Sequence, residues 1–291
     1  MVKRRLNLNA LASLHGAILL FALCALFGKW VDMNAQGIVF YRSLFACLSL
    51  VVFCLFSARS LRLEYPMVVK LFASGALLAI HWWSFFYTIQ VSTVTLGLIT
   101  FACFPVFVAL LQVFFEPPPS LIKPLFIAVL SALGVTVSIW PSQSLVFQPD
   151  AIATGLLSAL TFALLTLCNR QFSQRLSGTQ IACYQNGFAA LLLLPWVYNS
   201  TAWPELTTFA QLLLMGIIFT ALAHTLLIHS LKQLNAFIAS ISINLEPIYG
   251  IFAAFILLNE PIDRYIILGA GLVISTSFIA LKPAPRKEED D

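Results

Sequence analysis

The chain has 291 residues, of which 60% are hydrophobic and only 10% are charged. Soluble proteins average about 25% charged and about 45–50% apolar residues, so this composition argues strongly against a soluble all-helical protein. The formal net charge of +4 comes from basic residues that are scattered between apolar runs. Nucleic-acid binding needs such residues gathered in a patch, and no nucleic-acid partner is expected.

The first apolar run follows a basic segment, residues 1–9, and could be mistaken for a signal peptide. The run is about 20 residues long, and it ends in Phe27-Gly-Lys-Trp30 without the small-residue pattern of a cleavage site. We therefore interpret it as a retained first membrane span.

Ten apolar runs of about 20 residues are each long enough to cross a hydrocarbon core of about 30 Å. They cover residues 10–30, 36–57, 67–88, 93–115, 121–140, 151–169, 179–198, 208–229, 234–258 and 264–281. The weakest border is the polar break at residues 90–93, between the third and fourth runs. Short connections predict antiparallel neighbouring helices, and no connection is long enough to hold a soluble domain.

The basic residues predict the orientation, because Lys and Arg concentrate in cytoplasmic loops. With both termini in the cytoplasm, 13 of the 16 basic residues fall on the cytoplasmic side, two fall outside and Arg42 lies within a span. The cytoplasmic set is Lys3, Arg4, Arg5, Arg59, Arg62, Lys70, Lys123, Arg170, Arg175, Lys232, Lys282, Arg286 and Lys287, and the outer pair is Lys29 and Arg264. This bias supports ten spans.

The chain also carries a weak internal repeat. Aligning Pro105 with Pro247 matches the apolar positions of residues 89–96 with those of residues 231–238. Downstream, Phe115-Glu-Pro117 resembles Asn259-Glu-Pro261. Five spans per half would insert the second copy from the opposite side, an inverted-topology repeat typical of secondary transporters. We expect a first repeat in residues 1–145, a second in 146–283, and a charged cytoplasmic tail in 284–291.

These patterns resemble the drug/metabolite transporter superfamily and, within it, the EamA family. The matching pieces are His15-Gly16 at the family's Trp-Gly position, Lys29, Phe40-Tyr-Arg42, and a Pro…Glu-Pro pattern in each half. The resemblance implies a basket-like fold with a central cavity, lined mainly by helices 1, 3, 4, 6, 8 and 9. It also implies export or exchange of small metabolites, including amino acids.

Glu246 is the main candidate for a substrate or proton contact, because it is the only acidic residue deep in a predicted span. A charge at bilayer depth costs roughly 2.5–3.5 kcal/mol on insertion scales, so it usually has a partner or a function. Pro247 removes a backbone donor beside it and is expected to kink the helix. The alternative interpretation is a helix-packing contact at this kink.

Other candidates for the substrate site have structural alternatives. Arg42 and its neighbour Tyr41 belong to the family pattern, and Arg42 would bind a substrate carboxylate or close the outer side. Adjacent tryptophans point about 100° apart on a helix, so only one of Trp82 and Trp83 can face a cavity well. Trp82 is the candidate, with an interfacial aromatic belt as the alternative.

Polar residues complete the predicted set. Asn244 and Ser240 are four apart, as are Ser242 and Glu246, so each pair shares a helix face. Thr100 belongs to a weaker polar group on the fourth span. Hydrogen bonding between helices is the common use of such side chains and remains the alternative. The four histidines and six cysteines show no metal-site spacing, so no metal, cofactor or disulfide is expected.

The predicted function is a secondary transporter, most consistent with amino-acid-like cargo, in a bacterial inner membrane. The chain has no Walker A sequence, so ATP would not drive it directly. Protons are a candidate coupling ion. A lipid-linked sugar flippase of the same fold is the closest alternative, and a lateral opening between helices would distinguish it. A membrane enzyme would need clustered acids, whereas the acids of this chain are dispersed.

Overall fold

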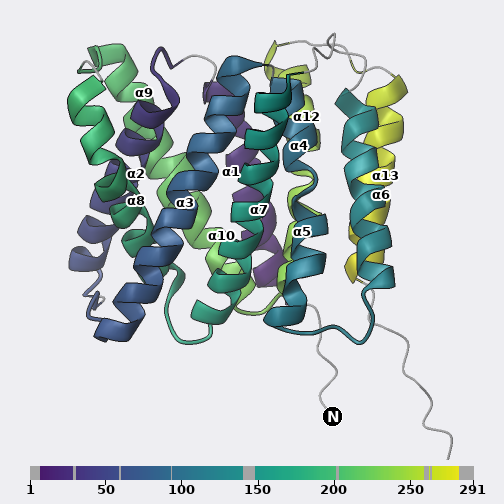
Figure 1. The fold of residues 1–291 in the computed structure, drawn as a ribbon, viewed down its shortest axis with the longest axis horizontal. Coiled ribbons are helices and arrows are strands. Elements are labelled where there is room, and N and C mark those ends of the chain that lie inside the picture. Colours follow the sequence, from purple (N-terminus) through teal and green to yellow (C-terminus); the bar gives the residue numbers. More distant parts are fainter. Residues whose placement is uncertain are drawn as a thin grey trace, which may run out of the picture.

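The computed structural model describes residues 7–28, 31–58, 60–92, 94–139, 148–200, 203–258, 262 and 264–281. These ranges form an all-helical bundle whose long helices run side by side (Figure 1). The elements are α1 (Leu8–Gly28), α2 (Ala35–Phe56), α3 (Tyr65–Val91), α4 (Val94–Phe101), α5 (Phe104–Leu111), η1 (Gln112–Phe114), α6 (Ile122–Ile139), α7 (Pro149–Phe172), α8 (Gly178–Ser200), α9 (Leu206–Gly216), η3 (Ile217–Leu222), α10 (Ala223–Leu231), α11 (Ala236–Ile243), α12 (Glu246–Leu258) and α13 (Arg264–Leu281).

The helices match the ten predicted spans. In the described ranges, eight helical segments are long and apolar enough to cross a membrane, and two shorter apolar helices, Leu8–Cys24 and Ile122–Ser138, supply the first and fifth spans. The expected break between the third and fourth spans is confirmed, because α3 ends at Val91 and α4 begins at Val94. This is the architecture of a multi-pass membrane protein.

Two of the predicted spans are pairs of helices. The fourth span breaks between α4 and α5, and the ninth breaks between α11 and α12. In each case the second helix restarts one residue before a proline, at Phe104 before Pro105 and at Glu246 before Pro247. Proline lacks an N–H group and its ring clashes with the preceding turn, so a helix breaks or kinks there. Glu246 therefore begins a helix, whereas the sequence placed it inside a kinked one.

The Asn244 side chain connects the two breaks. Its Nδ2 donates hydrogen bonds to the carbonyl oxygen of Ala102, at 3.3 Å, and to Ser131 Oγ, at 3.1 Å. Ala102 lies in the break between α4 and α5. Broken helices are tolerated in a membrane where neighbouring groups satisfy the freed backbone. Asn244 thus supplies a donor to the break in the other half of the chain.

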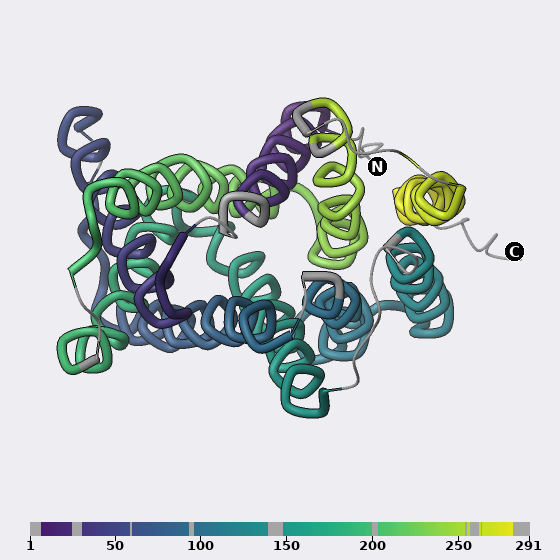
Figure 2. Tube along the Cα trace, turned by 90° about the horizontal axis from the view of Figure 1, so that it is seen from above, coloured from purple at the N-terminus to yellow at the C-terminus, as the bar shows by residue number. Residues whose placement is uncertain are grey.

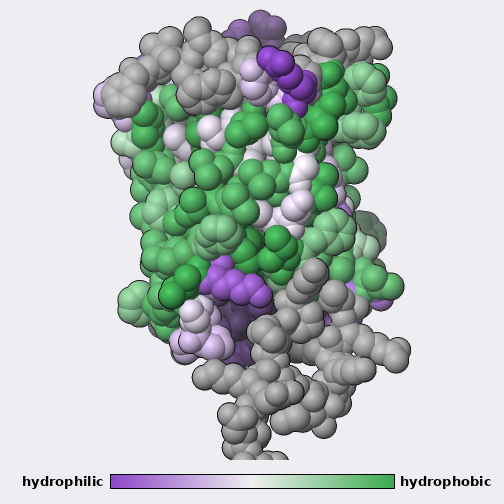
Figure 3. All heavy atoms as spheres, turned by 90° about the vertical axis from the view of Figure 1, so that its right-hand side faces the viewer, coloured by the Kyte–Doolittle hydropathy of each residue, from purple (hydrophilic) through white to green (hydrophobic). Residues whose placement is uncertain are grey.

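Helices from the two halves of the chain pack against each other. α2 and α3 contact α8, α3 also contacts α7, and α1 lies between α10 and α12. Figure 2 shows α6 and α13 as a pair at one side of the bundle. Figure 3 views this side and shows a mainly hydrophobic surface with hydrophilic groups near the two ends. A surface with this distribution suits contact with lipid tails.

Candidate functional site

A small cavity lies inside the bundle, between helices of both halves. It is lined by Phe21 of α1, His81, Trp82 and Phe85 of α3, Phe101 of α4, Phe162 of α7 and Glu246 of α12. Its volume is about 10 Å³, which is room for roughly one water molecule. These helices correspond to the first, third, fourth, sixth and ninth predicted spans, all of which the family resemblance places around a central cavity.

Glu246 is the acidic residue of this cavity. It is the first residue of α12, and only 9% of it is exposed. Among the described residues, no hydrogen bond or ion pair within 4.0 Å satisfies its carboxylate. A carboxylate in this setting is costly unless a ligand, a proton or water meets it.

Arg42 lies next to the cavity, on α2. It is fully buried, its Nε donates to Thr220 Oγ1 at 2.9 Å, and its guanidinium carbon lies 3.9 Å from the ring centre of Trp82. Its two terminal nitrogens, Nη1 and Nη2, are buried without a hydrogen-bond partner among the described residues. The structure therefore brings together three predicted residues, Arg42, Trp82 and Glu246. Trp82 contacts the arginine and lines the same cavity as Glu246.

Thr220 meets Arg42 through an irregular piece of the eighth span. This span consists of α9, the π-helix η3 and α10. Thr220 Oγ1 donates to the carbonyl oxygen of Met215, five residues earlier, at 2.8 Å, and its lone pairs face the Arg42 Nε. π-Helical turns are rare and occur frequently at functional sites.

Two histidines extend the cluster around Trp82. His224 of α10 stacks on the Trp82 ring, with centroids 6.0 Å apart and planes at 23°. His81 stacks on Phe162 at 4.5 Å, and its Nδ1 donates to the carbonyl oxygen of Ser158 at 3.0 Å. Both nitrogens of His224 are buried and lack a hydrogen-bond partner in the described part of the chain.

His224 was not singled out from the sequence, and in the described part of the chain it has no hydrogen-bond partner. The residue was missed as a site candidate. No local pattern in the sequence marked it, because Trp82, on which it stacks, belongs to a distant segment.

The other predicted site residues lie outside this cluster. Thr100 Oγ1 donates to the carbonyl oxygens of Leu96 and Gly97, within its own helix. Ser242 Oγ donates to the carbonyl oxygen of Ile238. Tyr41 packs its ring against Phe40 and Phe45, and Asn244 bridges the two helix breaks. Their role as substrate contacts stays a prediction, and so does any role of Lys29 and residues 259–261, which lie outside the described residues.

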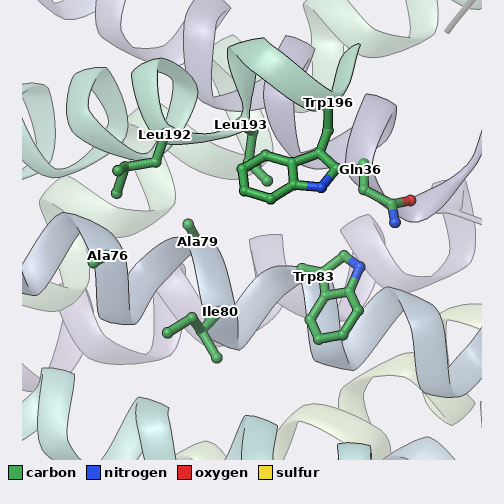
Figure 4. A pocket seen from close by; sticks show the side chains of 8 residues that line it. All are labelled: Gln36, Ala76, Ala79, Ile80, Trp83, Leu192, Leu193 and Trp196. Carbon is green, nitrogen blue, oxygen red and sulfur yellow. The ribbon is translucent and has the colours of Figure 1, made fainter. Parts of the chain in front are cut away.

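The tryptophan pair divides as the helix geometry predicts. Trp82 points inward, while Trp83 lines a separate cavity of about 400 Å³ between α2, α3 and α8. Figure 4 shows Trp83 and Trp196 on opposite sides of this cavity, with the Gln36 amide at one end. The remaining lining residues are alanine, leucine and isoleucine. This cavity shares no lining residue with the central one, and its apolar walls do not suit a charged ligand.

A second polar network lies at the end of the bundle where α7 and α10 finish. Arg170 Nε donates to Glu116 Oε1 at 3.1 Å, and its Nη1 donates to the carbonyl oxygens of Leu231 and Lys232 at 2.7 and 3.0 Å. An open pocket of about 350 Å³ lies beside it and includes Glu116. In the described ranges, no group of three His, Cys, Asp or Glu residues could hold a metal ion.

Comparison with known proteins finds a transporter family and several relatives. The sequence pattern of the EamA-like transporter family matches residues 150–282. Two relatives named S-adenosylmethionine uptake transporter, from Rickettsia bellii and Rickettsia conorii, are each 24% identical. The Rickettsia bellii match covers 85% of this chain and 84% of the relative, and the Rickettsia conorii match covers 88% and 87%.

A solved structure described only as a crystal structure of a protein shares the fold. It superposes with a TM-score of 0.78 at 14% sequence identity and covers 94% of this chain and 96% of its own. This likeness shows the fold alone. The match over residues 150–282 and the membrane-spanning helices agree: the second half of the chain is similar to the EamA-like transporter family, whose members are transporters and not enzymes.

Proposed function

We propose that this secondary transporter carries a small amino-acid-like metabolite across the bacterial inner membrane by alternating access. The observation that carries the proposal is the buried carboxylate of Glu246, which is the first residue of α12 and lines a small aromatic cavity. Substrate sites formed by broken helices near the midplane are typical of secondary transporters. The small volume of the cavity suggests that the helices separate before cargo enters.

The proposed topology retains the inverted repeat, with residues 1–145 and 146–283 as its halves and both termini in the cytoplasm. Two observations support it. The breaks at Pro105 and Pro247 fall at corresponding positions of the two halves. α1 also begins and α13 ends at the same end of the bundle (Figure 1), as an even number of crossings requires.

The names of the relatives suggest which amino-acid-like cargo to test first. S-adenosylmethionine contains an amino-acid group, a sulfonium ion and a flat adenine. The Glu246 carboxylate suits the ammonium group of such a molecule, and the aromatic cavity wall suits the sulfonium and the adenine through cation–π contact and stacking. The relatives are named for uptake, whereas the sequence predicted export or exchange. We propose that the direction follows the gradients of cargo and coupling ion.

Counterflow in proteoliposomes tests this proposal. Vesicles are loaded with unlabelled S-adenosylmethionine or with a pool of amino acids, and uptake of the labelled compound is followed. We expect uptake that depends on the internal pool and falls at least tenfold in Glu246→Gln, because the ammonium group loses a charged partner. Glu116→Gln is the matched control, because Glu116 lies at the bundle end.

Two outcomes would change the proposal. If neither S-adenosylmethionine nor any amino acid exchanges, the cargo class is wrong, although the family remains. If Glu246→Gln transports as well as the wild-type protein, with or without a pH gradient, the carboxylate contacts neither cargo nor a coupling proton.

A further inference from the structure

We propose that Arg42, Trp82 and His224 form a subsite that binds the carboxylate of the transported molecule. This inference rests on the proposed function, since it takes the cargo to be amino-acid-like. It assigns the second charged group of the cargo to a place in the bundle, opposite in charge to Glu246.

The Arg42 guanidinium is the main element of the subsite. Burying a cation without an anion is costly, and each buried donor without an acceptor adds to that cost. Contact with the Trp82 ring at 3.9 Å and the bond to Thr220 offset part of it. Nη1 and Nη2 have no hydrogen-bond partner among the described residues, and the weakly accepting thiol of Cys24 lies beside the guanidinium. A carboxylate accepts two parallel hydrogen bonds from the fork of a guanidinium, which is the arrangement that these two donors offer.

Further unpaired nitrogens lie beside the guanidinium. Trp82 Nε1 and both ring nitrogens of His224 are buried, and none has a hydrogen-bond partner in the described ranges. The two rings stack, so these polar atoms belong to one cluster around Trp82. Most buried polar atoms in proteins are paired, and each exception calls for an explanation such as an absent ligand or water. With His224 neutral, four of these five unpaired nitrogens are donors, so they point to a ligand rich in acceptor oxygens.

Thr220 positions the arginine for this ligand. Its hydroxyl accepts the hydrogen bond from Arg42 Nε, so the two terminal nitrogens can both bind the ligand. The π-helix η3 places this hydroxyl, because Thr220 bonds backward to Met215 across five residues. An arginine held at Nε keeps its fork in one orientation, which reduces the entropy lost on binding.

The chemistry of the cluster favours a carboxylate over a phosphate. Arg42 supplies one positive charge and Glu246 supplies one negative charge to the same buried region. A zwitterionic amino-acid group places its carboxylate on Arg42 and its ammonium on Glu246, so every buried charge gains a partner. A phosphate would add negative charge near Glu246 that no second cation in the cluster balances.

Binding to purified full-length protein tests the subsite. The probes are S-adenosylmethionine and decarboxylated S-adenosylmethionine, which differ in the carboxylate. We expect the wild-type protein to prefer the carboxylate form by about 10- to 100-fold, the usual range for a hydrogen bond to a charged group. In Arg42→Gln this preference should fall to near one. The affinity for S-adenosylmethionine should drop, because its carboxylate loses the guanidinium, whereas the affinity for the decarboxylated compound should stay unchanged. A preference that survives in Arg42→Gln overturns the proposal.

A second variant and a second probe keep the test decisive. His224→Phe retains a ring against Trp82 but removes both nitrogens, and we expect it to lower the preference three- to tenfold. This variant tests the subsite independently if Arg42→Gln does not fold. If the wild-type protein binds neither S-adenosyl compound, the proposed cargo is wrong, and acetate decides the subsite. Acetate should then raise the unfolding temperature above that in matched chloride, and less so in His224→Phe. An equal response of both proteins overturns the subsite.

Discussion

Arg42 and Arg170 are both buried arginines in membrane-spanning helices, but their surroundings differ. Arg170 donates to Glu116 and to the carbonyl oxygens of Leu231 and Lys232. Arg42 donates from Nε to a single hydroxyl, and in the described ranges its two terminal nitrogens have no hydrogen-bond partner. The protein supplies acceptors for Arg170, whereas the terminal nitrogens of Arg42 are available to a ligand.

The difference supports a structural role for Arg170 and the binding role proposed above for Arg42. Arg170 joins the C-terminal ends of α7 and α10 to Glu116, just after η1, and satisfies carbonyls that a helix end leaves unpaired. Arg42 lies beside the central cavity, where its burial is costly in the absence of cargo. Burial alone does not distinguish the two, whereas the list of hydrogen-bond partners does.

Replacing Arg42 gives the largest expected effect on transport. Arg42→Gln should lower the transport rate of S-adenosylmethionine at limiting concentration by about 100-fold, since two charged hydrogen bonds are lost at about 1.5 kcal/mol or more each. Counterflow normalised to the amount of folded protein measures this. A rate within threefold of the wild type would remove Arg42 from the site.

Replacing Arg170 should act mainly on stability. Arg170→Gln is expected to lower the free energy of unfolding by about 2 kcal/mol, because the charged bonds to the carbonyls of α10 are lost. The preference for the carboxylate-bearing cargo should stay at the wild-type value. Denaturant unfolding in mixed micelles gives the first quantity. If Arg170→Gln is fully stable, Arg170 does not stabilise this junction.

Replacing Thr220 should give a smaller, partly reversible effect. Thr220→Val keeps the side-chain shape and removes the hydroxyl that accepts from Arg42 Nε. One neutral acceptor is worth about 1 kcal/mol, so affinity for S-adenosylmethionine should fall about fivefold. Thr220→Ser should restore it. Equal losses in both variants would attribute the effect to packing of the π-helix.

Replacing Glu116 should give the smallest effect. The Glu116 side chain is 47% exposed, and solvent-exposed ion pairs contribute about 0–1 kcal/mol. Glu116→Gln should therefore reduce stability by at most about 1 kcal/mol, and less at high salt. A loss as large as that of Arg170→Gln would show that the ion pair, and not the carbonyl bonds, dominates the network.

Local patterns in the sequence predicted much of the fold. The ten apolar runs gave every span within about three residues, because length and hydrophobicity decide membrane crossing. Prolines lie at both interruptions, and the kink expected at Pro247 is found there as a turn between α11 and α12. Helix geometry predicted that only one of Trp82 and Trp83 faces the centre, and the charges of Arg42 and Glu246 stood out against their apolar neighbours.

The rest depended on contacts between distant segments. His224 became a candidate only when the fold stacked it on Trp82. The partner of Arg42 is Thr220, 178 residues away, and a π-helix that no sequence pattern marked places it there. Asn244 has a polar side chain of the kind that contacts ligands, yet its amide donates a hydrogen bond to Ala102 in the other half of the chain. Tertiary packing decides which polar groups have partners, and a single sequence does not contain that information.

The most direct measurement of the central claim compares carboxylate selectivity in three proteins. Wild type, Arg42→Gln and Arg170→Gln are reconstituted side by side, and counterflow is measured with differently labelled S-adenosylmethionine and decarboxylated S-adenosylmethionine in one mixture. The predicted result is a high ratio of the two rates in wild type and Arg170→Gln and a ratio near one in Arg42→Gln. Ratios that fall equally in both variants, or in neither, would contradict the assignment of Arg42 to the substrate carboxylate.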